Sequence, residues 1–164
     1  MPPEPEALGL FLERFQSFYQ RERWHVVMPI VPAAAAHHRL AWLHPFMDGN
    51  GHVARLYTDA CLSSLPMPGY GIWNISRGLA RDREGYRFAL SGADHPRRGA
   101  LDGRSNLSDK GLTDFCRFFL TTCLDQVQYM SGLLQVNELM GRIHGYVQMR
   151  SVNLTPPLPH ATKE

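Results

Sequence analysis

The stretch His44-Pro45-Phe46-Met47-Asp48-Gly49-Asn50-Gly51-His52-Val53-Ala54-Arg55 decides how this chain is interpreted, because a base, a carboxylate, a glycine-rich turn and a guanidinium fall together in it. Gly49, Asn50 and Gly51 tolerate positive φ values, so successive backbone N–H groups can point into one concavity that suits anionic oxygens. Apolar residues then recur at helical spacing over residues 53–61, which predicts that the turn lies at a helix N-terminus. The free N–H groups and the dipole there favour phosphate. We therefore interpret the stretch as a phosphate-handling site.

The other polar side chains of the stretch suit transfer of a phosphate-bearing group. His44 can act as a general base, because imidazole titrates near neutral pH. Asp48 can hold one corner of an octahedral Mg²⁺, an ion that takes one or two carboxylates together with substrate phosphate oxygens. Arg55 lies one helical turn beyond Gly51, on the face that looks back at the turn, where its planar fork can bind phosphate. Pro45 disfavours the α region at the residue before it, so the preceding helix is expected to end there.

This stretch resembles the signature loop of the Fic family, which is written H-P-F-x-D/E-G-N-G-R-x-x-R in family terms. It departs from that pattern at His52, where the family usually has arginine. The resemblance implies an all-α fold, a Fic-type helical bundle with the active loop between two central helices. It also implies a protein adenylyltransferase, a nucleotidyltransferase that uses ATP as co-substrate and Mg²⁺. Such an enzyme moves AMP onto a Ser, Thr or Tyr hydroxyl of a protein target.

Roles for individual residues follow from the resemblance, position by position. His44 is implied to be the catalytic base, Asp48 the metal ligand, and Phe46 an anchor that fixes the loop in the core. The implied nucleotide- and phosphate-binding residues are Gly49, Asn50, Gly51, His52 and Arg55. Because histidine is mostly neutral at pH 7 whereas arginine is always charged, His52 predicts a weaker phosphate clamp. The alternative for His52 is a surface residue in the first helical turn.

The segment before the loop also departs from the family. Family members carry a β-hairpin flap there, whereas the 43 residues before His44 predict two helices and no alternating strand pair. The flap is therefore expected to be missing, either because it was lost or because the chain is the C-terminal piece of a longer protein. No serine or threonine has a glutamate four residues later, as the family's inhibitory helix requires. Inhibition is expected to come from a missing N-terminal segment or a partner protein.

Two further functions stay open beside adenylyl transfer. The same loop could carry out another phosphate-bond transfer, such as phosphorylation, transfer of a different nucleotide or removal of AMP, and the motif does not choose among these. Alternatively, the chain is a catalytically weak domain that binds nucleotide or protein. The intact His44, Asp48 and Arg55 favour an enzyme, whereas His52 and the missing flap favour the binding domain.

Composition sets the broad class. The 164 residues predict one helical domain over residues 1–150 and a flexible Pro-rich tail over 151–164. The formal net charge of +2, from 17 basic and 15 acidic residues, argues against nucleic acid or a membrane as the main partner. No long apolar run or secretory signal occurs. The cysteines lack C-x-x-C spacing, so we expect buried thiols in a reducing, cytoplasmic setting; they are Cys61, Cys116 and Cys123.

Helical periodicity places the remaining elements. It predicts helices over residues 8–23, 32–43, 72–79, 84–93 and 108–134, with Ser108 as a cap, and a helical continuation over 135–149. The helix over 32–43 contains four consecutive alanines, residues 33–36, that permit close packing, so it is expected to lie centrally under the loop. Gly141 and Gly145 in the last segment are compatible with a homodimer contact.

Some residues carry two interpretations. His37 and His38 are either packed or solvated histidines or, less in keeping with known spacings, zinc ligands. Trp73, Asn74 and Tyr86 follow the motif helix, in a region that in the family helps to wall the nucleotide pocket. For Trp73 and Tyr86 the other interpretation is a place in the core.

Overall fold

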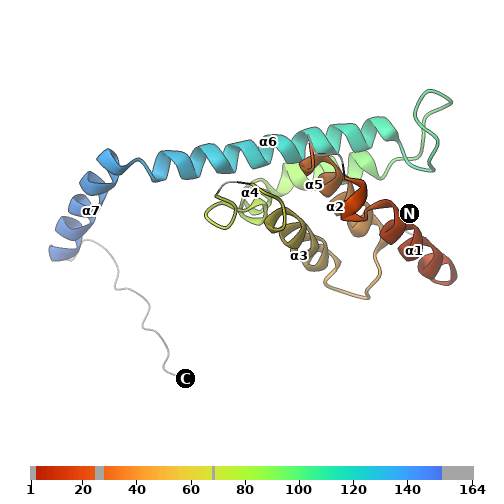
Figure 1. Ribbon diagram of the computed structural model, residues 1–164, viewed down its shortest axis with the longest axis horizontal. Coiled ribbons are helices and arrows are strands. Elements are labelled where there is room, and N and C mark those ends of the chain that lie inside the picture. Colours follow the sequence, from red (N-terminus) through yellow and green to blue (C-terminus); the bar gives the residue numbers. More distant parts are fainter. Residues whose placement is uncertain (1–2, 25–27, 68, 153–164) are drawn as a thin grey trace, which may run out of the picture. The chain divides into compact units, whose positions relative to one another are not determined.

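The computed structural model describes residues 3–24, 28–67 and 69–152, and within these residues the chain forms seven α-helices and no β-strand. Figure 1 shows the helices in chain order, and the predicted all-α class is confirmed. The α-helices are α1 (Leu8–Phe18), α2 (Ile30–Leu43), α3 (Asn50–Ser63), α4 (Ile75–Arg81), α5 (Arg83–Ala93), α6 (Asp109–Leu133) and α7 (Val136–Ser151). Residues 153–164, most of the predicted tail, lie outside the described residues.

Two compact units make up the chain, Met1–Val127 and Gln128–Glu164. The first unit contains α1 to α5 and most of α6, and the second contains the end of α6 and α7. In the second unit the Arg142 guanidinium donates to the carbonyl oxygens of Gly132 and Leu133, so α7 is tied to the end of α6. Of the helices in the described ranges, none combines the length and the hydropathy that crossing a membrane requires.

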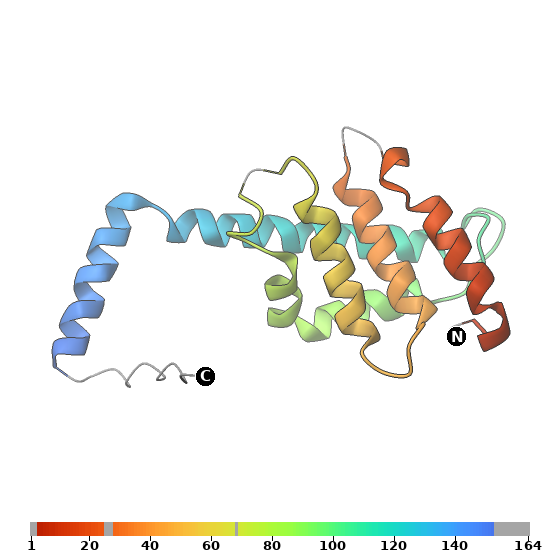
Figure 2. The ribbon, with the colours of Figure 1, turned by 60° about the horizontal axis from the view of Figure 1, so that its bottom comes forward.

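The centre of the first unit is the antiparallel pair α2 and α3. Figures 1 and 2 show these helices side by side, with α1 against the other flank of α2. Ala33, Ala34 and Ala36 of α2 are fully buried, and Ala54 of α3 is too, so small side chains allow the two backbones to approach closely. The predicted central helix is thereby confirmed. It begins at Ile30 rather than Pro32, which places the proline in the first turn, where its missing N–H costs nothing.

Helix α6 supplies the aromatic core beneath α2. Phe115 and Phe119 are fully buried, and the ring of Phe115 lies 5.4 Å from that of His38, centroid to centroid. Burying each phenylalanine contributes about 1.5–3 kcal/mol. Burial raises the pKa of the Cys116 thiol to about 11 and that of Cys123 to about 12, so both thiols stay protonated. All three cysteines are free, as the sequence predicts.

Capping side chains set several helix ends. Asn74 accepts from the Arg77 N–H, which starts α4 at Ile75 rather than at the predicted Ile72. The Ser108 hydroxyl oxygen accepts from the Gly111 N–H at 3.0 Å, which confirms the predicted cap of α6. The first helix is shorter than predicted: α1 ends at Phe18, and residues 21–23 form a separate 3₁₀ turn.

Candidate functional site

The motif loop, residues 44–49, joins the C-terminus of α2 to the N-terminus of α3. His44 follows the last residue of α2 in the left-handed conformation, with φ 49° and ψ 53°, so α2 ends where Pro45 predicts it. Gly49 precedes α3 with φ 79°, a conformation in which a side chain is unfavourable. The loop therefore reverses the chain between two packed helices and delivers its residues to one end of the pair.

His44 is exposed and has a defined tautomer. Its Nδ1 lies 2.9 Å from the carbonyl oxygen of Ala41, and a carbonyl oxygen can only accept a hydrogen bond. Nδ1 must therefore carry the proton, which leaves the lone pair of Nε2 available. A histidine oriented through Nδ1 with a free Nε2 is what a general base needs.

Asn50 holds the loop in place. Its Oδ1 accepts from the backbone N–H of Phe46 at 2.9 Å, and its Nδ2 donates to the Phe46 carbonyl oxygen at 2.7 Å. The asparagine is only 6% exposed, whereas the Phe46 side chain is 54% exposed. The expectation that the Phe46 ring anchors the loop in the core is thus wrong, because the backbone of Phe46 is fixed instead. The side-chain amide of Asn50 is thus used within the loop. The donor that Asn50 can offer to a ligand at the start of α3 is its backbone N–H.

The motif loop offers a carboxylate at Asp48 and backbone N–H groups at the glycine turn. The carboxylate of Asp48 is exposed, and its Oδ1 accepts from the Gly49 N–H at 2.6 Å. This contact fixes the direction of the carboxylate and leaves Oδ2 to face solvent. The N–H groups of Asn50 and Gly51 come before the first hydrogen bonds of α3, and the His52 N–H already donates to the Gly49 carbonyl. Two adjacent amides at a helix N-terminus suit an anionic oxygen.

Arg55 folds back over the turn, as its spacing predicts. A Cβ built on Gly51 would lie 3.3 Å from Nη1 of Arg55, so the guanidinium covers the glycine backbone. Nη2 of Arg55 lies 3.1 Å from Nδ1 of His52. Because a guanidinium can only donate, His52 accepts at Nδ1 and carries its proton on Nε2. His52 therefore contacts the arginine instead of presenting a second cation.

A series of hydrogen-bonded side chains, which we call the polar relay, connects Thr58 and His37 to Tyr86, next to Arg55. The Thr58 hydroxyl donates to the Ala54 carbonyl at 2.8 Å, so it must accept from Nδ1 of His37 at 2.7 Å. Nε2 of His37 then accepts from the Tyr86 hydroxyl at 2.8 Å. Burial lowers the pKa of His37 to about 4, which keeps the imidazole neutral. The donor and the acceptor of each hydrogen bond in this series are therefore determined.

The relay ends at the motif arginine. The Tyr86 hydroxyl donates a hydrogen bond to His37, and its oxygen also accepts one from the Arg55 guanidinium. Burial raises the pKa of the Tyr86 phenol. Tyr86 thus lies beside the candidate site through Arg55, while its ring packs at 5.7 Å from that of His37. His38, the other central histidine, is buried and bonds the Asp94 carboxylate at 3.0 Å. Both histidines of α2 are packed residues with protein partners.

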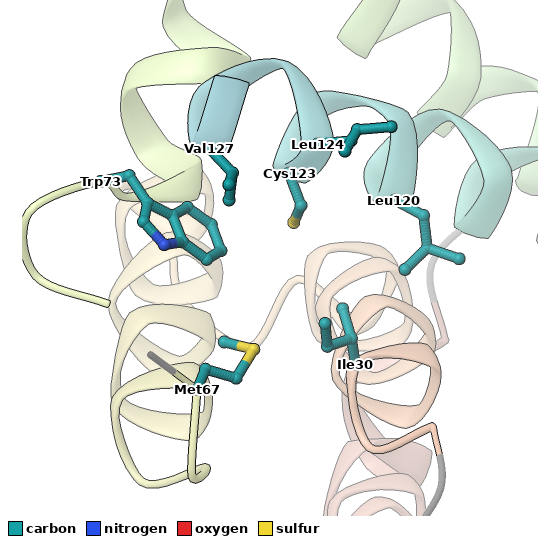
Figure 3. Close-up of a pocket in the computed structure, with 7 residues that line it drawn as sticks. All are labelled: Ile30, Met67, Trp73, Leu120, Cys123, Leu124 and Val127. Carbon is teal, nitrogen blue, oxygen red and sulfur yellow. The ribbon is translucent and has the colours of Figure 1, made fainter. Parts of the chain in front are cut away.

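Trp73 belongs to a separate apolar cavity of about 320 Å³. Figure 3 shows its indole facing Met67 and the side chains of Cys123 and Val127 from α6. Ile30 also lines this cavity and lies at the start of α2, whereas His44 lies at the end of the same 14-residue helix, about 20 Å away by helical rise. Trp73 is 7% exposed, so its core interpretation is confirmed and it does not reach the motif loop.

Comparisons with known proteins agree with the loop geometry. Residues 1–62 match the sequence model of the Fic/DOC family. Over 68 residues the chain is 37% identical to proteins named protein adenylyltransferase Fic from Drosophila grimshawi and Drosophila melanogaster, and 35% identical to the protein of that name from Drosophila mojavensis. The matched segment covers 42% of this chain and 14% of each relative, so the chain spans only a small part of the relatives' length. Residues 1–62, which include the motif loop, are therefore similar to the Fic/DOC family.

Proposed function

We propose that this chain transfers AMP from ATP to a hydroxyl group of a protein. The observation that carries the proposal is the hydrogen bond from Nδ1 of His44 to the Ala41 carbonyl, which leaves Nε2 free to act as a base in the first residue of the motif loop. The matched relatives, which are named protein adenylyltransferases, support the same chemistry.

In the proposed reaction the hydroxyl oxygen of the target attacks the α-phosphorus of ATP. His44 Nε2 accepts the hydroxyl proton as the new O–P bond forms, and the bond to the β-phosphate oxygen breaks, so that pyrophosphate leaves. General-base catalysis of this type contributes about 10²- to 10⁴-fold to the rate. Three groups would bind the phosphate oxygens and orient the triphosphate of ATP for in-line attack: the backbone N–H groups of Asn50 and Gly51, and the Arg55 guanidinium.

Asp48 fits the Mg²⁺ that such a reaction uses. Its carboxylate is exposed and held in direction by the Gly49 N–H, and one carboxylate is the protein share that Mg²⁺ commonly takes beside phosphate oxygens and water. The ion, when bound, neutralises charge on the phosphates. Asp48 is the carboxylate that the motif loop offers to the ion, and the described residues contain no group of three or more His, Cys, Asp or Glu side chains arranged for a metal.

Arg55 is proposed as the cationic part of the clamp. It lies against Gly51 and is oriented by His52 on one side and by the Tyr86 hydroxyl on the other. Fixing the fork in this way reduces the side-chain entropy that phosphate binding would cost. On this proposal, Tyr86 supports the nucleotide site without itself contacting the nucleotide.

The test is the intact mass of proteins after incubation of the chain with ATP and Mg²⁺, alone and with cell lysate proteins. We expect a mass gain of one AMP on the chain or on a lysate protein. His44→Ala should abolish the gain and leave ATP binding in place. His95→Ala is the matched control, because His95 is likewise exposed and likewise bonds a carbonyl, that of Ser91, through Nδ1 at 2.8 Å.

Other outcomes would replace the proposal. A gain of one phosphate in place of AMP would show kinase chemistry, and loss of AMP from a premodified protein would show the reverse reaction. If ATP binds and no mass changes, the chain is a nucleotide-binding domain. If His44→Ala transfers as well as the unmodified chain, His44 is not the base.

A further inference from the structure

A second cavity lies on the far flank of α2, between α1 and the segment that leads into α6. Its volume is about 570 Å³, within the range of small-molecule sites in proteins. Figures 1 and 2 show α1 beside α2. Leu107 and Leu112, before and within α6, also line the cavity. It shares no lining residue with the apolar cavity around Trp73.

Aromatic rings make the wall of this cavity. Trp42 of α2 meets Phe11 of α1 edge to face, with ring centroids 5.7 Å apart. Phe15 lies 5.0 Å from Tyr19 by the same measure, and Phe18 of α1 is 67% exposed at the rim. Rings arranged in this way offer both faces and edges to a planar apolar body.

Two buried donors of the lining have no acceptor. Among the described residues, four buried side-chain nitrogens lack a hydrogen-bond partner, and two of them, Nη1 of Arg39 and Nε1 of Trp42, belong to residues that line this cavity. The two residues are three apart on α2 and therefore share a face. A buried donor without an acceptor costs about 1–3 kcal/mol, and more when it is charged. An acceptor supplied by a ligand would remove that cost.

The charge of the lining is positive. Arg39 donates a hydrogen bond to the Tyr19 hydroxyl, but none of the ion pairs of the described residues includes Arg39. Arg14 and Arg104 also line the cavity. The carboxylate of Asp109, which lines the cavity too, lies against the backbone of Gly103, where an added Cβ would overlap it. The half-buried guanidinium of Arg39 is therefore uncompensated.

We propose that this cavity is a binding site for a small aromatic carboxylate. The carboxylate would accept from Arg39 Nη1 and Trp42 Nε1, and the ring would pack against Phe11 and Phe15. The inference is independent of nucleotide transfer, because none of the residues involved belongs to the motif loop. The site would give the chain a small-molecule ligand other than ATP.

The test uses 3-phenylpropionate, followed by ¹H–¹⁵N correlation spectra of the labelled chain. The indole N–H signal of Trp42, assigned by its loss in Trp42→Phe, should shift with saturation, because that N–H gains an acceptor. The matched amide, 3-phenylpropanamide, tests the charge, and acetate tests the ring. We expect the amide to bind at least tenfold more weakly, since a charge-assisted hydrogen bond contributes more than a neutral one. Acetate should also bind at least tenfold more weakly, since it lacks the ring that would pack against Phe11 and Phe15.

Variants separate the contact from a change in folding. Arg39→Gln should weaken 3-phenylpropionate at least tenfold, and Arg39→Lys should retain part of the affinity. Arg87→Gln is the control, because Arg87 is an exposed arginine of α5 outside the cavity lining. Equal binding of the acid and the amide to the unmodified chain would overturn the role of Arg39, and equal binding of acetate would overturn the aromatic site. Absence of any shift at Trp42 would overturn the proposal, and this comparison needs no variant that might misfold.

Discussion

Nη2 of Arg55 donates to Nδ1 of His52 across 3.1 Å. His52 stands where the Fic pattern has its first arginine, and it contacts Arg55, which matches the second arginine of that pattern. On the proposed function, the phosphate clamp of this chain would consist of the Arg55 guanidinium with His52 as its support. That arrangement orients Arg55, but it provides one guanidinium where the family pattern has two.

Restoring arginine at this position tests the clamp. We expect His52→Arg to tighten ATP binding about tenfold at pH 7.5, because a second guanidinium adds a charged donor near the turn. Titration calorimetry with ATP and Mg²⁺ measures the change. His52→Gln is the control, since a glutamine oxygen can still accept from Arg55 without adding charge. Unchanged ATP affinity in His52→Arg would argue against a phosphate role for this position.

The two hydrogen bonds between the Asn50 side chain and the Phe46 backbone predict that this side chain stabilises the motif loop. We expect Asn50→Ala to release both the N–H and the carbonyl of Phe46 and to lower the free energy of unfolding by about 1–3 kcal/mol. Amide hydrogen exchange at Phe46 should become faster than in the unmodified chain. Phe46→Ala should have a smaller effect on stability, because that ring is largely exposed. The reverse order would restore the ring as the anchor of the loop.

The pKa of His37 predicts a loss of stability in acid. Burial holds this pKa at about 4, below the ordinary value of 6.5, so between those pH values the unfolded chain binds more protons than the folded chain. The free energy of unfolding should therefore fall as the pH drops from 6.5 to 4, by up to about 3 kcal/mol from this residue. Urea unfolding at pH 7 and pH 4.5 measures the difference. His37→Gln, which cannot titrate, should flatten that interval even if it is less stable at pH 7.

Gly78 of α4 predicts an effect of close packing. A Cβ at this position would lie 2.5 Å from Cγ2 of Thr122 and 3.0 Å from Cγ of Gln126, both on α6. We expect Gly78→Ala to destabilise the first unit by about 1–3 kcal/mol through overpacking, measured by thermal or urea unfolding. Gly9→Ala in α1 is the matched control, because nothing lies within 4 Å of its Cβ. It should be neutral or stabilising by up to about 1 kcal/mol through helix propensity. Equal stability of the two variants would contradict the close approach of α4 to α6.

Local patterns in the sequence were sufficient to identify the helices and the position of the motif loop, although not every helix end. Apolar periodicity and caps such as Ser108 act over a few residues, so they place α5 and α6 within one or two residues of the observed bounds. The loop residues are adjacent in the chain, and their arrangement follows from the turn they share. The position of Arg55 over Gly51 follows from helical geometry in the same way.

Relationships between distant residues were not predictable. His37 bonds Thr58, 21 residues away, and Tyr86, 49 residues away, and no motif marks such a set. The sequence suggested a contact role or a core role for Tyr86, and the structure gives it a half-buried side chain and a hydrogen bond from Arg55. The ring of Phe46 was assigned to the core from the family pattern, whereas the Asn50 amide carries that function through hydrogen bonds to the backbone of residue 46. Side-chain partners of this kind depend on the packing of whole helices.

The backbone of His44 places function and stability in opposition. Among the described residues it is the one non-glycine residue with positive φ, at a helix end where glycine is usual. A side chain in this conformation costs about 1 kcal/mol relative to glycine. Selection for stability alone would therefore replace the histidine with glycine and make the chain more resistant to unfolding. The same replacement would remove the one imidazole that the Ala41 carbonyl orients.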